Sequence, residues 1–259
     1  MRIRELVALL CLGFGTQTTP AAAQRSGDQA RLVFTVSGAY IEGKGLWSVP
    51  QQPLEPSDIV SLNRSIKRTL SAGFSGTYYP GQNVGITADA LLLGLGFEDG
   101  CQAVSVTNPN NAQVCSEIDG QSRSAAAVVV SAGGVFRVYS REFISPFARV
   151  SAGLLFSNLS STRTDGTFGT NRTLLVIYED DKQTRVRPAF GIGVGASVAL
   201  SKAYHLRWEV RDNIVGVDRV TGPTSATFTI PPREVAYKHL FSILIGLDVI
   251  LERQRGRRY

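Results

Sequence analysis

The stretch from 186 to 215 limits the fold more than any other part of the sequence. It contains two segments in which apolar residues alternate with small or charged ones, and the segments meet at 201–202. In the second segment Arg207, Glu209 and Arg211 stand at every second position. Alternation with a period of two indicates strands with two different faces. A soluble sheet turns its charges to water, whereas a transmembrane barrel turns its apolar face to lipid and its charges to the lumen.

The same alternation recurs along the chain, and the lengths of the connections follow a regular order. Strands are predicted at 31–41, 66–79, 83–97, 121–139, 145–158, 236–252 and in the two segments of 186–215. Long loops are predicted at 42–65, 98–120, 159–185 (with a short strand at 174–178) and 216–235, and short turns at 80–82, 140–144 and 201–202. Long and short connections therefore alternate. This order predicts an all-β fold, an eight-stranded antiparallel up-and-down transmembrane β-barrel; the alternative is a soluble, secreted β-barrel or sandwich.

The N-terminus has the pattern of a secretory signal peptide. Arg2 and Arg4 precede an apolar segment at 6–14, and three alanines at 21–23 form a cleavage site. We therefore predict a signal peptide at 1–23, a barrel at 24–252 and a basic tail at 253–259. No apolar run of 18 or more residues follows the signal, so a membrane-spanning segment of the mature chain would have to be a strand.

Two cysteines remain after the signal peptide, Cys101 and Cys115. In an exported chain such a pair favours a disulfide, and two cysteines are too few for a four-ligand zinc site. Two independent free thiols are the alternative. We expect no metal and no cofactor.

The net charge indicates little about partners, but the charged residues on the strands predict what the lumen contains. The formal net charge of +6 comes largely from four arginines in the last seven residues, and nucleic acid is not an expected partner of an exported chain. The parity of the strands places a set of charged residues inside the barrel: Asp89, Arg137, Arg149, Arg187, Arg207, Glu209, Arg211, Lys238 and Asp248. Because an unpaired buried charge costs several kcal/mol, we predict a network of ion pairs that plugs the lumen. A narrow gated pore or proton path is the alternative.

From 31 to 251 the chain resembles the small eight-stranded outer-membrane barrels of the OmpA/OmpX kind. The resemblance rests on the alternating strands, on the segment HLRWEVRD at 205–212, and on Gly246, Val249 and Leu251 in the last strand. It implies a location in the outer membrane of a Gram-negative-type envelope, contact with outer-membrane lipid, and recognition of the last strand by the barrel-assembly machinery. It names no ligand, because a fold does not fix a function.

Catalysis is the alternative from another class. Some barrels of this kind modify lipid, which needs a nucleophile or base near the outer leaflet. His205 is predicted near a short turn on the luminal side, and His239 near the external rim on the lipid side, with Phe241 two residues on. No Ser-His-acid arrangement can be assembled from these positions. We therefore expect a non-enzymatic structural or surface-binding role, with an external ligand contacted by the long loops.

Overall fold

The computed structural model describes residues 29–138, 143–157, 162–180, 186–224 and 229–254. The predicted signal peptide lies outside these residues, as do the last five residues of the basic tail. Within them, no helix is long and apolar enough to cross a membrane. The elements follow the chain as β1 (Gln29–Ile41), β2 (Gly45–Glu55), β3 (Asp58–Ile66), β4 (Thr69–Tyr78), β5 (Val84–Ser105), α2 (Pro109–Ile118), β6 (Ser122–Arg137), β7 (Ile144–Ser157), β8 (Thr162–Phe168), β9 (Thr173–Asp180), β10 (Val186–Ala199), β11 (Tyr204–Val220) and β12 (Arg233–Gln254).

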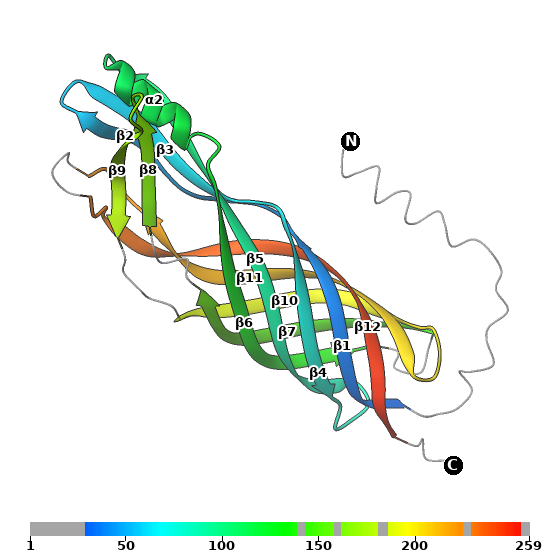
Figure 1. Cartoon of the computed structure of the whole chain (residues 1–259). Helices are drawn as coiled ribbons and strands as arrows, with labels where there is room; N and C mark the ends of the chain where they lie inside the picture. The colour runs from blue at the N-terminus through cyan, green and yellow to red at the C-terminus, as the bar shows by residue number, and fades with distance from the viewer. Residues whose placement is uncertain (1–28, 139–142, 158–161, 181–185, 225–228, 255–259) are drawn as a thin grey trace, which may run out of the picture.

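Eight of these strands form a closed antiparallel barrel (Figure 1). They are β1, β4, β5, β6, β7, β10, β11 and β12, and the pairing of β1 with β12 closes the ring. Gln29 pairs with Gln254, so the described chain begins and ends at the same end of the barrel. The fold class predicted from the alternating segments is confirmed.

The strands are strongly staggered around the ring. Following paired residues once around the barrel from Lys238 of β12 leads back to the same strand at Asp248, ten residues further along. A stagger of this kind accompanies a strand tilt of roughly 35 to 45°. An eight-stranded barrel is narrow enough for its own side chains to fill the interior.

The outer face of the barrel is apolar. Large apolar side chains are exposed there on every barrel strand: Phe34, Val36 and Tyr40 on β1, Leu70 and Phe74 on β4, Val84, Ile86 and Leu92 on β5, Val130 and Phe136 on β6, Val150, Leu154 and Phe156 on β7, Phe190, Ile192 and Val194 on β10, Leu206, Trp208 and Val210 on β11, and Phe241, Ile243 and Ile245 on β12. We call this band the apolar belt. Between these positions the same strands turn charged, small and some apolar side chains inward, as the period of two requires.

The segments predicted as long loops are largely regular structure, which corrects the sequence interpretation. β2 and β3 form a hairpin that pairs with the far part of β5, and β8 pairs with β9. β3 has a strict burial alternation, with Val60, Leu62 and Ile66 inside. Its neighbours rich in Pro, Gln and Ser hid this pattern. The short strand predicted at 174–178 is confirmed as part of β9.

Helix α2 was also missed, although its start follows the usual rules. Asn108 accepts a hydrogen bond from the backbone N–H of Asn110, and Pro109 occupies the first turn. Asparagine is a preferred N-cap and proline is favoured at the first helical position. The pair Asn108-Pro109, which lies in the segment predicted as a loop at 98–120, therefore marks the beginning of a helix.

Candidate functional site

The inward positions of β11 carry the centre of a buried charge network. Arg207, Glu209 and Arg211 follow one another at every second residue and are all buried. Glu209 accepts a hydrogen bond from Arg211 Nε at 2.7 Å and one from Arg207 Nη2 at 3.1 Å. A third guanidinium group, that of Arg149 on β7, lies 3.6 Å from Glu209 Oε2. One carboxylate thus meets three arginines.

Two further carboxylates extend the network to the neighbouring strands. Asp89 on β5 pairs with Arg149, and Asp248 on β12 lies 3.9 Å from Arg207. Asp248 also accepts hydrogen bonds from the hydroxyls of Thr35 at 2.7 Å and Ser197 at 3.0 Å. Three arginines and three acids therefore meet in the lumen, and their formal charges balance.

Aromatic rings hold the arginines at the end of the barrel where the chain begins and ends. The Arg137 guanidinium lies 3.6 Å from the centre of the Tyr79 ring, and that of Arg207 lies 4.0 Å from the centre of the Phe147 ring. Arg137 also donates to the carbonyl oxygens of Gln82 and Ala30, at 2.8 and 2.9 Å. Cation–π contacts are strongest where the cation is shielded from water.

The remaining two predicted luminal bases lie apart from this network. Arg187 pairs with Asp218 at 2.7 Å and is half-buried. Lys238 has the inward parity of its strand, but β1 ends before reaching it, and its ammonium group donates to the carbonyl oxygen of Gly45 at 3.1 Å. Both residues thus lie at the rim of the barrel opposite the end where the described chain begins and ends.

Glycines on β10 make room for the network. A Cβ atom at Gly193 would lie 2.5 Å from Glu209 Oε1 and 3.2 Å from Arg149 Cγ. A Cβ at Gly191 would lie 2.6 Å from the Ser151 hydroxyl oxygen. The alternating glycines of this strand are therefore explained by packing inside the barrel.

Apolar side chains as well as charged ones point into the lumen. Beyond the charges lies an apolar layer of inward side chains, formed by Leu91, Val129, Leu155, Ala189, Val215 and Leu244. Two cavities among the described residues touch the charges or this layer, and each measures about 10 Å³. Such a volume accommodates about one water molecule.

Beyond the barrel, the segments predicted as loops pack into one folded head, with β2, β3, the far part of β5, α2, β8 and β9 side by side (Figure 1). Gln52 on β2, which is 1% exposed, accepts hydrogen bonds from the Tyr178 hydroxyl of β9 at 2.7 Å and the Thr224 backbone N–H at 3.0 Å. Its own amide donates to the carbonyl oxygen of Thr224 at 3.1 Å. One buried side chain thus joins three of the four long connections.

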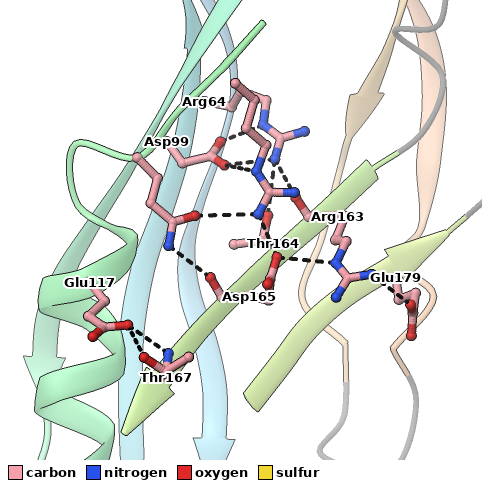
Figure 2. Close-up of polar contacts among 10 residues, drawn as sticks. Arg64, Asp99, Glu117, Arg163, Thr164, Asp165, Thr167 and Glu179 are labelled. Carbon is pink, nitrogen blue, oxygen red and sulfur yellow. Dashed lines mark hydrogen bonds and ion pairs between the residues drawn. The ribbon is translucent and has the colours of Figure 1, made fainter. Parts of the chain in front are cut away.

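A second cluster ties the β8–β9 hairpin to the rest of the head (Figure 2). Arg64 on β3 pairs with Asp99 on β5, with Nε 2.5 Å from Oδ1, and donates to the carbonyl oxygen of Arg163 at 2.7 Å. Arg123 on β6 pairs with Asp165 on β8 at 2.5 Å. Because Arg64 and Asp99 are both buried, these charges replace their lost hydration with one another.

Helix α2 is attached to the head at both ends. Asp58 accepts hydrogen bonds from the backbone N–H and hydroxyl of Thr107, from the backbone N–H of Asn108 and from the Asn111 amide, at 2.7 to 3.1 Å. These bonds, the Thr107 N–H first, hold the pKa of Asp58 well below its usual range. Near the other end Glu117 accepts hydrogen bonds from Thr167, which lower its pKa (Figure 2).

The predicted disulfide is present. It joins Cys101 on β5 to Cys115 on α2 across 14 residues of sequence, with the Cα atoms 5.2 Å apart. The bond lies in the head, outside the barrel wall, and fixes the helix against the strand that precedes it.

The two histidines lie on opposite faces of the barrel wall. His205 is luminal, with Nδ1 3.4 Å from the Ser197 hydroxyl oxygen. His239 is exposed on the outer face, with Nδ1 2.6 Å from Asp212 Oδ2 and the Phe241 ring stacked beside it. In the described part of the chain, no group of three or more His, Cys, Asp or Glu side chains is arranged to hold a metal ion.

Comparisons with known proteins support the fold. The sequence matches no family model and no curated protein sequence. Among solved structures, the outer membrane protein OprG from Pseudomonas aeruginosa is similar, with a TM-score of 0.51 and 10% identity over 88% of this chain and 98% of that one. Neisserial surface protein A (0.43, 11% identity, 87% and 99%) and Ail of Yersinia pestis (0.39, 11% identity, 85% and 98%) also match. The similarity to OprG, together with the closed ring of eight strands, shows that the chain has the fold of the small outer-membrane barrels.

Proposed function

We propose that this protein is an outer-membrane barrel that is closed to permeation and binds a partner at the cell surface through its folded head. The observation that carries the proposal is the continuity of the interior. The buried charges, the apolar layer and the head core follow one another along the barrel, and the cavities among the luminal charges are about 10 Å³ each.

The apolar belt supports the membrane location. A protein in water seldom exposes a continuous apolar band around its whole circumference, because each exposed apolar Å² costs about 25 cal/mol in water. Lipid chains remove that cost. The charged positions of the same strands are turned inward, where ion pairs compensate them.

Fractionation tests the location. The full-length precursor, expressed in a Gram-negative host, should be recovered with the outer membrane and should migrate faster on a denaturing gel before heating than after. Recovery in a soluble fraction without detergent would end the membrane assignment.

Conductance tests the closed lumen. In planar bilayers the purified protein should show no ion channels at neutral pH, with a known open porin as the positive control. Steady channels formed by the unmodified protein would favour the alternative, a gated pore.

Assembly through the last strand is part of the proposal, with Gly246, Val249 and Leu251 as the residues recognised. Gly246 has a second role that must be separated from recognition. A Cβ atom there would lie 2.7 Å from the Val36 carbonyl oxygen and 2.9 Å from Ser37 Cβ. Substitution of Leu251, whose side chain is 63% exposed, therefore tests recognition without the clash that a Cβ atom at Gly246 would cause.

A non-enzymatic role is also proposed. The alternative, a lipid-modifying enzyme, would use His239, whose imidazole is paired with Asp212. Phe241 stacks on that ring and Ile214 faces it across the strand pair, and neither supplies a nucleophile. A His239→Ala variant should leave the lipid composition of the host unchanged by mass spectrometry; loss of a modification made by the unmodified protein would establish the enzyme.

A further inference from the structure

A basic notch lies where the head leaves the barrel wall. It is formed by Gly43 and Lys44 of the β1–β2 connection, by Gly45 at the start of β2, by the end of β3 and the β3–β4 connection at 65–68, and by Glu98 on β5. Its volume is about 480 Å³, far larger than that of the luminal cavities. The backbone at Gly43 packs closely against the β3–β4 connection, since a Cβ atom there would lie 2.4 Å from the Ile66 carbonyl oxygen.

Positive charge exceeds negative charge in this notch. Arg68 pairs with Glu42 at 3.5 Å and Lys67 with Glu98 at 4.0 Å, and all four side chains are at least a third exposed. Such exposed pairs are weak and easily exchanged for another anion. An anionic ligand could therefore take the place of Glu42 beside Arg68 or of Glu98 beside Lys67.

Two further lysines have no acid to neutralise them. Lys44 lines the notch, and Lys238 reaches its back by donating to the Gly45 carbonyl oxygen at 3.1 Å. Among the described residues neither lysine has an ion pair. The hydrogen bond to Gly45 places the ammonium group of Lys238 beside the residue that follows Lys44, so two like charges adjoin the notch.

The notch adjoins the apolar belt at β1 and β4. Glu42 is two residues beyond Tyr40 on β1, and Arg68 is two residues before Leu70, which is 78% exposed on the outer face. Tyr40 and Leu70 are paired across the β1–β4 ladder. A lipid whose chains cover these two side chains would therefore have its headgroup at the notch.

We propose that this notch binds the phosphorylated headgroup of a membrane lipid, with Lys44 and Arg68 as principal contacts and Lys67 and Lys238 in support. The inference rests on the proposed membrane location. Basic pockets beside membrane-spanning segments attract anionic headgroups, with a contribution near the surface for each lysine or arginine. A lipid is favoured over a soluble anion because the apolar surface of Tyr40 and Leu70 adjoins the charges.

Thermal unfolding in detergent tests the proposal. The protein, purified in a non-ionic detergent, is titrated with dihexanoyl phosphatidic acid, dihexanoyl phosphatidylcholine and inorganic phosphate, and the shift in Tm gives each dissociation constant. Phosphatidic acid should stabilise the unmodified protein at the lowest concentration. Lys44→Gln with Arg68→Gln should weaken its binding roughly 30-fold, because each basic residue near the membrane surface contributes about 1 kcal/mol to the binding of an anionic headgroup. Lys202→Gln, in the exposed β10–β11 turn at the end of the barrel opposite the head, is the matched control and should bind as the unmodified protein does.

Three results would overturn the proposal. The first is equal affinity of the double variant and the unmodified protein for phosphatidic acid. The second is equal stabilisation by phosphatidylcholine and phosphatidic acid. The third is stabilisation by inorganic phosphate at the same concentration as by phosphatidic acid, which would make a soluble anion the ligand. Each variant is first checked for heat-dependent mobility; if the double variant does not fold, Lys44→Gln alone should bind about fivefold more weakly. Binding is measured on protein purified in detergent, so a negative result contradicts the lipid-binding notch alone. The membrane location is contradicted by a different result, recovery of the protein in a soluble fraction.

Discussion

Replacing Glu209 with glutamine tests whether the luminal charges stabilise the barrel. Glu209 is 2% exposed and lies against Arg149, Arg207 and Arg211. The substitution keeps the size of the side chain and leaves two carboxylates against three guanidinium groups. Arg149 and Arg207 each retain another acid, whereas Arg211 has no other ion pair among the described residues.

The expected cost follows from this imbalance. Removing one partner of a buried ion pair costs about 3 to 5 kcal/mol, and Glu209→Gln should lie near the lower value because the amide oxygen still accepts a hydrogen bond. Adding Arg211→Gln restores neutrality, and the double variant should regain about 1 kcal/mol or more. The control is Glu234→Gln, which breaks the exposed Arg219 pair of 3.3 Å and should cost less than about 1 kcal/mol.

Urea unfolding from phosphatidylcholine vesicles measures these free energies. The fluorescence of Trp208, which is exposed on the outer face, should change when the barrel leaves the lipid. Equal losses for Glu209→Gln and Glu234→Gln would refute the stabilising role of the network. So would a double variant no more stable than Glu209→Gln alone.

Four other outcomes are expected. Cys101→Ser with Cys115→Ser should lower head stability by about 3 kcal/mol, seen as faster proteolysis at α2 with the barrel intact. Gln52→Leu should cost about 1 to 3 kcal/mol by leaving buried partners without hydrogen bonds, and should release the external segments to the same protease. Because the pKa of Asp58 is lowered by folding, its stabilisation of the head is complete above the unfolded pKa of about 3.9. Head protection should hold from about pH 7 to 5 and fall below about pH 4, and Asp58→Asn should weaken that dependence, leaving the part that is due to Glu117. Val194→Arg, on the lipid face of β10, should cost about 2 to 4 kcal/mol in vesicles, and a negligible cost would contradict lipid contact there.

The barrel could be predicted from the sequence because its physical requirement is local. A strand between lipid and a polar lumen must alternate, and Arg207, Glu209 and Arg211 display that alternation directly. The same parity placed Asp89 and Asp248 in the lumen, where the structure brings them to the arginines of other strands. Which acid meets which base depends on the stagger of the strands, which the sequence does not state.

The head could not be predicted in the same way, because its strands pair with segments far along the chain. Gln52 is a polar residue in a segment rich in glutamine and proline, and only its contacts with β9 and the β11–β12 connection make it a core residue. The basic notch was missed for a related reason. Lys44, Arg68 and Lys238 come from three separate segments, and none of them shows a pattern in its own stretch of sequence.

β5 is a single strand of 22 residues that belongs to the barrel wall at one end and to the head at the other. At about 3.3 Å per residue it spans roughly 70 Å without interruption. The head is therefore an extension of the wall and not a tethered module. A partner bound there would be held at a fixed distance and orientation relative to the membrane. A force applied to it would act on the barrel as shear along the backbone hydrogen bonds of β5.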